Sequence, residues 1–265
     1  MSILLQRGNL SYKVTVVDDC SNESYDDIIA QFQEKIDIQY LRLSVNSGGG
    51  LARQYGIDHT KLPYIVFLDA YDLFYNCDSL YTLYSYIIRG YDMVSGSEWV
   101  EEKKGFFVNE GDLHGKMYRR QYILNHHVTF NNTRFHEDNY FNSFMLLSGA
   151  YNINLPDVTY LYCDNQESIT KKNSNKEFEC LEILISNMKE LFDLIPITTN
   201  NKGLFKQFIF MKFKYFNRLY TNFTKQEKSI FSSWIMKYFP NFISFVGVDD
   251  ISELEKMVCC YFDVL

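Results

Sequence analysis

The segment "YIVFLDAYDLF" (residues 64–74) joins an apolar run to two carboxylates, Asp69 and Asp72. Its first five residues are rich in β-branched and aromatic side chains, which predicts a central strand covered on both faces. Ligands of open α/β sheets bind outside the carboxyl ends of the strands, so acids at this position indicate a site for a phosphate-bound cation. Asp also opens turns and caps helices readily, and this segment alone leaves that structural alternative open.

The composition favours a globular protein that does not bind nucleic acid over a large surface. With 265 residues the chain can bury a sizeable core, as one large domain or as a domain with an appendage. Its aromatic content is 17% and it has only four prolines, which argues against long disordered segments. The net charge of -7 argues against a large nucleic-acid interface, although a local basic patch stays open.

The cysteine pattern and the hydropathy pattern predict a cytoplasmic protein. The six cysteines show no CxxC spacing and are too sparse for a disulfide framework, so we expect reduced thiols. The chain does not open with a secretory signal pattern, and no apolar run approaches the ~18 residues of a membrane-spanning helix.

Strand and helix patterns alternate over the first half of the chain. "KVTVVDD" (13–19) and "IQYLRLSV" (38–45) have strand character, "SYDDIIAQFQEKI" (24–36) has helical spacing, and "NSGGGLARQYGI" (46–57) is a glycine loop running into a short helix. This alternation predicts an α/β fold with a mainly parallel sheet and right-handed crossovers.

The second half changes from mixed patterns to helical ones. We expect a helix at 77–90, a strand pair at 91–108 and a helix at 137–147. From about Lys176 the chain carries helical spacing and no strand signal, at 177–195, 204–220 and 251–265. The predicted organisation is therefore one domain at residues 1–172 and a helical C-terminal region at residues 173–265.

Several stretches carry the pattern of a known family. In chain order they are "VVDDCS" (16–21), "NSGGGLARQYGI" (46–57), "FLDAYD" (67–72), "HGKMYRRQYI" (114–123), "FHEDNYFN" (135–142) and "YLYCDNQESIT" (160–170). They resemble the signature blocks of the family 2 glycosyltransferases, whose forms include VVDDGS, NxGxxxARNxGI, LDxDD and an ED pair. The resemblance implies the A-type glycosyltransferase fold and transfer of a sugar, with UDP-sugar as the expected donor, to an acceptor hydroxyl by inverting direct displacement.

Sugar transfer needs a cation for the departing diphosphate and a base for the acceptor proton. By resemblance, Asp69 contacts the ribose and Asp72, with Asp69, is the candidate ligand of Mn²⁺ or Mg²⁺. Such hard cations use only one or two protein carboxylates besides the substrate phosphates. Asp138 takes the place of the family's general base, with Glu137 beside it. The alternative for these two acids is an ordinary acidic helix start that suits the helix dipole.

The resemblance also assigns residues to donor binding. Asp18 and Asp19 are expected to meet the uracil ring or to hold Arg53, for which a salt bridge on a helix surface is the alternative. His114 and Lys116 are expected near the donor sugar or diphosphate. The glycines at 48–50 let the backbone pass close to the nucleotide, or form a plain flexible loop.

The chain departs from the family pattern in ways that favour a second hypothesis. Tyr71 replaces the central acid of LDxDD, and Gln54 replaces the asparagine of the ARN block. "SILLQ" (2–6) stands where the family's first helix ends, so the family's first strand is expected to be missing or supplied by a partner, with weak nucleotide-sugar binding as the result. The second hypothesis is a degenerate, non-catalytic module of the same fold that binds a nucleotide or a partner.

The acceptor is not readable from the sequence. The candidates are a glycan, a lipid-linked glycan, a protein or modified DNA, and a homo-oligomer is left open. Residues 202–220 hold five cations and no acids among many aromatics. This segment predicts either a buried amphipathic helix with snorkelling lysines or peripheral contact with an anionic membrane.

Overall fold

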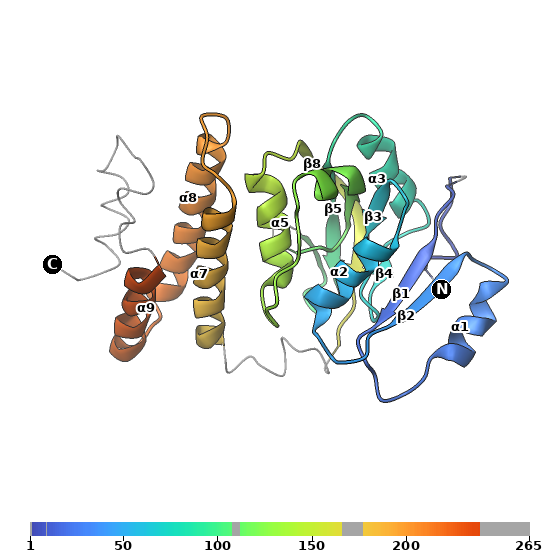
Figure 1. The fold of residues 1–265 in the computed structure, drawn as a ribbon, viewed down its shortest axis with the longest axis horizontal. Helices are drawn as coiled ribbons and strands as arrows, with labels where there is room; N and C mark the ends of the chain where they lie inside the picture. Colours follow the sequence, from blue (N-terminus) through green and yellow to red (C-terminus); the bar gives the residue numbers. More distant parts are fainter. Residues whose placement is uncertain (1, 9, 108–111, 166–176, 239–265) are drawn as a thin grey trace. The chain divides into compact units, whose positions relative to one another are not determined.

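The structure is a computed structural model that describes residues 2–8, 10–107, 112–165 and 177–238 (Figure 1). Its contacts divide the chain into two compact units. The first contains Met1–Leu146 and Ala150–Lys172, and the second contains Leu147–Gly149 and Asn173–Leu265.

The first unit begins with a small parallel strand pair. Strand β1 (Val14–Asp18) leads through helix α1 (Asp26–Gln33) to strand β2 (Ile38–Arg42), and the two strands form a two-stranded sheet. Helix α2 (Gly49–His59) follows and packs on β1. These elements match the predicted alternation of strands and helices.

The main sheet of the first unit has six strands in the order β3-β7-β5-β8-β4, with β6 paired to β5. The strands are β3 (Tyr64–Val66), β4 (Leu73–Phe74), β5 (Met93–Val100), β6 (Gly105–Phe107), β7 (Lys116–Arg119) and β8 (Asn152–Tyr162). Among the described strands of this sheet, only the β5–β8 pairing is parallel, and the other four pairings are antiparallel. The α/β class is confirmed, but the expectation of a mainly parallel sheet is wrong, because the sheet is mixed.

Among the described residues, β1 pairs with β2 and β3 pairs with β7, so β1 and β3 each keep one edge without a strand partner. The apolar side chains of both strands are half-buried, whereas those of the central strand β5 are almost all buried. The expectation that the family's first strand is missing here stays a prediction.

Helices pack on both faces of the main sheet. Met117 of β7 joins a buried cluster with Leu83 and Ile87 of α3 (Ser79–Ile87). The next residue, Tyr118, contacts Phe141 of α5 (Glu137–Leu147), with ring centroids 5.5 Å apart. Neighbouring residues of a strand point to opposite faces, so α3 and α5 cover the two faces of the sheet, as Figure 1 also shows. The short helix α4 (Arg120–Asn125) continues directly from β7.

The second unit is a helical layer with an aromatic core. Its helices are α7 (Glu177–Leu194), α8 (Lys202–Tyr220) and α9 (Lys225–Tyr238). The first two confirm the predicted helices at 177–195 and 204–220, α9 was not predicted, and the helix expected at 251–265 lies outside the described residues. None of the helices in the described ranges has the length and apolar character needed to span a membrane.

Candidate active site

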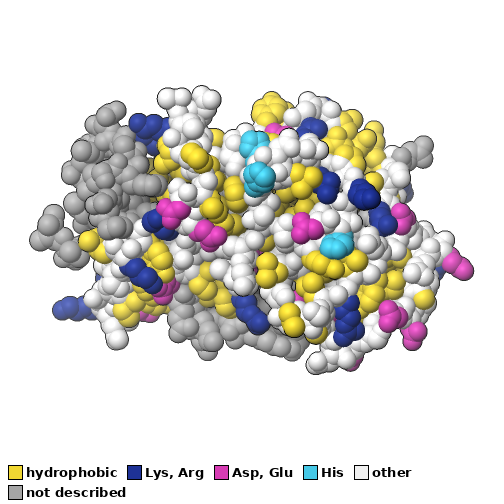
Figure 2. All heavy atoms as spheres, viewed as in Figure 1, with side chains coloured by type: hydrophobic (Ala, Val, Ile, Leu, Met, Phe, Trp, Pro, Cys, Tyr) yellow, Lys and Arg dark blue, Asp and Glu magenta, His cyan; other side chains and the backbone are white. Residues whose placement is uncertain are grey.

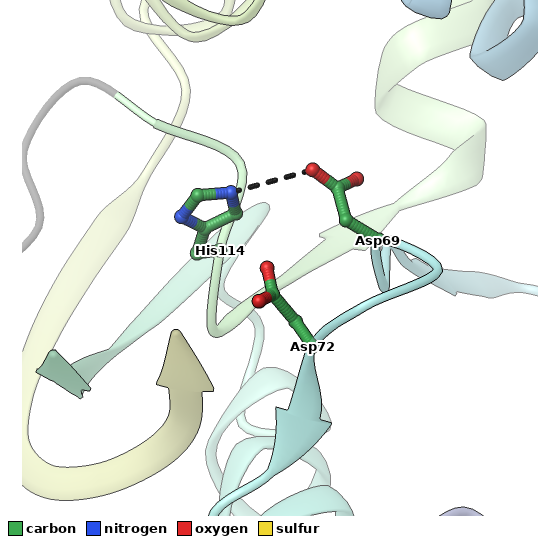
Figure 3. Close-up of side chains that lie close together, drawn as sticks. All are labelled: Asp69, Asp72 and His114. Atoms are coloured by element: carbon green, nitrogen blue, oxygen red, sulfur yellow. Dashed lines mark ion pairs between the residues drawn. The ribbon is translucent and has the colours of Figure 1, made fainter. Parts of the chain in front are cut away.

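The two acids that follow β3 meet a histidine from the turn before β7. The Asp72 N–H donates to the Asp69 carbonyl at 3.0 Å, and this tight turn brings both carboxylates toward His114 (Figure 3). Ligand atoms of the three side chains all lie within 4.8 Å of one another. The backbone therefore does form the turn that Asp residues favour, while the two side chains converge on a common centre.

Strand β8 holds the carboxylate of Asp72 in place. The Tyr160 hydroxyl donates to Asp72 Oδ2 at 2.7 Å, and the Cys163 N–H donates to Oδ1 at 2.9 Å. Burial raises the pKa of Asp72, and these two hydrogen bonds only partly oppose that effect. Asp72 is thus a buried acid whose two oxygens are oriented by a neighbouring strand.

His114 lies between two carboxylates and against an aromatic ring. Its Nε2 is 3.6 Å from Asp69 Oδ2, its Nδ1 is 3.4 Å from Glu98 Oε2, and its ring stacks on Tyr160 with centroids 4.7 Å apart. Burial lowers the pKa of His114, but the nearby carboxylates of Asp69 and Glu98 outweigh burial and raise the pKa to about 10. The neighbouring carboxylates thus favour the protonated ring, and only the neutral imidazole can ligate a cation.

Arg53 of α2 links the acidic turn to the start of α5. Its guanidinium nitrogens lie 2.8 Å from Asp69 Oδ1 and 3.0 Å from Glu137 Oε1. Burial alone would raise the pKa of Asp69, but His114 and Arg53 hold that pKa well below its usual value. The alternative of a salt bridge on a helix surface is wrong, because the Arg53 side chain is only 20% exposed and joins three elements.

The glycines at the start of α2 allow Arg53 of this helix to reach Glu137 of α5. A Cβ at Gly50 would lie 2.9 Å from the Glu137 Cγ atom, and Gly48 has a φ of +91° that L side chains rarely adopt. The loop therefore lets α2 approach α5 closely. Its predicted contact with the nucleotide stays a prediction.

Asp138 opens α5 beside Glu137 and is partly buried. The Asn139 N–H donates to its Oδ1 at 2.6 Å. Burial raises the pKa of Asp138 to about 7, with further contributions from the carboxylates of Asp112 and Glu137. This differs from an ordinary acidic helix start, in which an exposed carboxylate is simply ionised at the helix dipole.

Asp18 and Asp19 organise the loops at the ends of β1 and β2. Asp18 accepts hydrogen bonds from the Tyr40 hydroxyl at 2.7 Å and the Ser21 N–H at 2.8 Å. Asp19 accepts hydrogen bonds from the N–H groups of Ser47 and Gly48, both at 2.7 Å. The expectation that these acids hold Arg53 is wrong, because Asp69 and Glu137 hold it. Their contact with uracil stays a prediction.

Lys116 lies outside the convergent group. It is buried in β7, where its Nζ donates to the Asp112 carbonyl at 2.7 Å. The Asn142 side chain of α5 donates to the same carbonyl at 2.8 Å. The structure thus shows Lys116 fixing the loop that precedes His114, and its role at the donor diphosphate stays a prediction.

Two site residues were missed by the sequence reasoning. Glu98 contacts His114, and Tyr160 contacts both His114 and Asp72. Glu98 could have been suspected because it is a charged residue within the otherwise uncharged stretch "MVSGSEWV" (93–100). Tyr160 begins the quoted stretch "YLYCDNQESIT", whose residues from 166 on lie outside the described part of the chain.

A cluster of aromatic rings lies at the β5–β6 hairpin, with Tyr75 and Phe106 exposed and Trp99 half-buried. Phe106 is 58% exposed and contacts Trp99 and Tyr75, with ring centroids 4.5 and 6.2 Å apart. Tyr75 follows β4, and Trp99 follows Glu98 in β5. Because neighbouring strand residues point to opposite faces, Trp99 lies on the other face of the sheet from Glu98 and His114. Exposed apolar patches of this kind commonly mark binding surfaces. We call Tyr75, Trp99 and Phe106 the aromatic cluster.

Comparisons with known proteins relate this chain to glycosyltransferases. The chain is 35% identical over 71 residues to TuaG of Bacillus subtilis (strain 168), assigned to teichuronic acid biosynthesis as a glycosyltransferase. That match covers 26% of this chain and only 28% of TuaG.

Solved structures share the fold of this chain. The crystal structure of S. aureus TarS 1–349 in complex with UDP-GlcNAc has a TM-score of 0.75 and 15% identity, covering 99% of this chain and 83% of that one. The mannosyltransferase PcManGT from Pyrobaculum calidifontis, in complex with GDP-Man and Mn²⁺, has a TM-score of 0.56 and 16% identity, covering 71% of this chain and 57% of that one. The family description "Glycosyl transferase family 2" matches residues 2–148, more than half of the chain. The chain therefore belongs to glycosyl transferase family 2.

Proposed function

We propose that this protein transfers N-acetylglucosamine or a related sugar from a UDP-sugar to an acceptor hydroxyl, by direct displacement with inversion. The observation that carries the proposal is the convergence of Asp69, Asp72 and His114 beside the Arg53–Glu137 ion pair at the start of α5. The TarS structure contains UDP-GlcNAc, which makes that donor the first to test.

The convergent group suits a divalent cation. Two carboxylates and the imidazole, which would release its proton on binding, would form a mixed oxygen and nitrogen donor set that fits Mn²⁺, whereas Mg²⁺ would use the two carboxylates and keep more water. When bound, such a cation supplies positive charge for the departing diphosphate. Tyr71 is 68% exposed and offers no carboxylate, so Asp72 and His114 would provide the ligands that the family's central acid otherwise supplies.

Asp138 is the proposed general base. A pKa of about 7 lets a carboxylate accept a proton near neutral pH while remaining a stronger base than an ordinary Asp. Arg53 holds the neighbouring Glu137 at 3.0 Å, which positions the first turn of α5 and therefore Asp138. In this proposal Glu137 is a positioning residue.

Donor binding can be tested by thermal shift with UDP-GlcNAc, with and without Mn²⁺. A ligand at about 100 times its Kd stabilises the native state by roughly 2.7 kcal/mol, so we expect a clear rise in Tm that is larger with Mn²⁺. GDP-mannose serves as the matched nucleotide-sugar control and should give a smaller rise. A Tm that no nucleotide sugar changes would contradict the proposal.

The non-catalytic hypothesis is favoured by Tyr71, which occupies a position where the family carries an acid. It makes the same prediction for donor binding and the opposite one for turnover. Release of UDP from UDP-GlcNAc in the presence of acceptors separates the two hypotheses. Tight binding without any UDP release, including hydrolysis, would favour the non-catalytic module.

We further propose that the acceptor is an extended carbohydrate that packs one sugar ring, remote from the reacting hydroxyl, on the aromatic cluster. The Phe106→Ala and Tyr75→Ala double variant should raise the KM for a saccharide acceptor by roughly tenfold, because it removes much of the apolar contact area. The KM for UDP-GlcNAc should stay unchanged. Tyr151→Ala is the control, since Tyr151 is 60% exposed at the other end of β8. Equal effects of both variants, measured with a panel of oligosaccharides, would reject the role.

A further inference from the structure

One face of helix α8 packs into the core of the second unit. Phe205, Phe208 and Phe216 are each no more than 5% exposed. Phe205 contacts Phe192 of α7 at 5.2 Å between ring centroids, and Phe216 contacts Phe231 of α9 at 5.4 Å. This face accounts for the amphipathic pattern of the helix.

The opposite face carries apolar side chains that this packing does not explain. Phe210 and Met211 are each 50% exposed at the middle of the helix. Exposed Lys206 lies four residues before Phe210, and exposed Lys214 and Arg218 follow at three and seven residues after Met211. Residues three and four apart share a helix face, so these five form one surface stripe, which we call the basic stripe.

The charge of the basic stripe differs from that of the whole chain. The chain has a net charge of -7, whereas α8 contains five cations and no acid. Among the described residues, no ion pair involves Lys206, Lys214 or Arg218, while Lys189 and Lys237 of the neighbouring helices each pair with an acid. Figure 2 shows basic, acidic and apolar atoms interspersed over the helices of the second unit.

We propose that the basic stripe docks the protein on an anionic lipid surface. An amphipathic helix lying in a membrane interface places apolar side chains at the boundary of headgroups and acyl chains, while lysines and arginines meet the lipid phosphates. Phe210 and Met211, flanked by cations on long flexible stems, meet both requirements. The proposal concerns a surface contact and does not depend on the donor or on catalysis.

Vesicle co-sedimentation of the full chain tests the docking. Vesicles of phosphatidylcholine with phosphatidylglycerol should bind the protein at low salt, and binding should fall at high salt because exposed charges are screened. Vesicles of phosphatidylcholine alone should bind much less. Sedimentation that stays at background with the anionic vesicles at low salt would overturn the proposal.

Two variants separate the apolar and charged contributions. Lys206→Gln, Lys214→Gln and Arg218→Gln together should weaken binding roughly a hundredfold, since each cation near an anionic surface contributes about fivefold. Phe210→Ser with Met211→Ser should weaken binding roughly tenfold or more, because these side chains no longer enter the apolar boundary.

Matched control variants replace apolar or basic residues elsewhere on the surface. Ile28 and Ile88 of the first unit are 50% and 53% exposed, and their double replacement by serine should leave vesicle binding unchanged. A triple variant of exposed Lys35, Lys61 and Lys103 to glutamine controls for net charge. Losses in the controls equal to those in the basic-stripe variants would overturn the assignment to α8.

Two further measurements keep the outcomes distinct. Unchanged circular dichroism and an unchanged Tm response to UDP-GlcNAc should show that the basic-stripe variants fold and keep the donor site. Light scattering tests the other occupant of such a face, a second copy of the chain. A dimer that Phe210→Ser dissociates, without vesicle binding, would identify a protein interface and refute the lipid contact.

Discussion

Replacing Asp138 with asparagine should lower kcat by roughly 10²- to 10⁴-fold, the usual contribution of a general base, while donor binding stays largely unchanged. The amide cannot accept the acceptor proton, but it has nearly the same shape and can still accept the hydrogen bond from the Asn139 N–H. The measurement is UDP release with a saturating acceptor. Wild-type turnover in the variant would reject the role, and lost UDP-GlcNAc binding would indicate a structural role instead.

The pH dependence offers an independent check of the same residue. Because the base must be ionised, kcat of the wild type should fall about tenfold per unit well below pH 7, and the variant should lose this limb. The raised pKa also means that the native state binds the proton more tightly than the unfolded chain, so stability is lost as pH rises from 3.8 toward about 7. The neutral variant should therefore melt no lower than the wild type at alkaline pH.

A matched acid controls for charge at a helix start. Asp27 lies in the first turn of α1, as Asp138 lies in the first turn of α5, but its side chain is exposed. Asp27→Asn should keep both kcat and the acidic limb of the pH profile. A loss in this control equal to that of Asp138→Asn would mean that helix-start charge, and not proton transfer, determines the rate.

Replacing Asp72 with asparagine should abolish most of the Mn²⁺-dependent rise in Tm that UDP-GlcNAc produces. The amide lacks the charge of a carboxylate ligand, whereas the hydrogen bond from the Tyr160 hydroxyl can be kept or reversed in direction, so the fold should persist. The measurement is the Tm difference between samples with and without Mn²⁺ at fixed UDP-GlcNAc. At about 100 times the Kd the ligand-dependent stabilisation is roughly 2.7 kcal/mol, which is large enough to resolve.

The control for this variant is an acid in the next helix start. Asp78 immediately precedes α3 and is exposed, so Asp78→Asn should leave the Mn²⁺ response intact. An undiminished Mn²⁺ response in Asp72→Asn would remove Asp72 from the cation site. The donor-binding proposal would then have to rest on the other residues of the centre.

The sequence predicted the positions of the acids Asp69 and Asp72 better than the position of His114, the cationic side chain beside them. Asp69 and Asp72 could be placed at the end of a strand because the apolar run beside them is local in sequence. His114 was assigned to the donor, and its position beside Asp69 depends on pairing of β3 with β7, which brings together residues about 50 apart. Short strands that pair over such distances leave little local signal.

The same physical reason explains the wrong sheet direction. Strand β7 has four residues and begins with a buried lysine, so it has no clear strand pattern. Strand β8 contains Pro156, which removes a backbone donor and weakens a strand assignment. Without these two strands, the alternation in the first half predicts parallel pairing, whereas β7 pairs antiparallel with both β3 and β5.

The β1–β2 pair is separate from the main sheet, and this separation affects which part of the first unit unfolds most easily. Amide hydrogens in β5 lie in a sheet whose strand has neighbours on both sides, and they exchange only with large-scale opening. A two-stranded sheet is marginal by itself, and β1 and β2 rely on each other and on packing with α1 and α2. Their amides therefore belong to a less protected cooperative unit, which includes the loops that Asp18 and Asp19 organise. Binding of a nucleotide to these loops would require this unit to become ordered, which would weaken the measured affinity. The affinity would therefore depend on local order as well as on direct contacts.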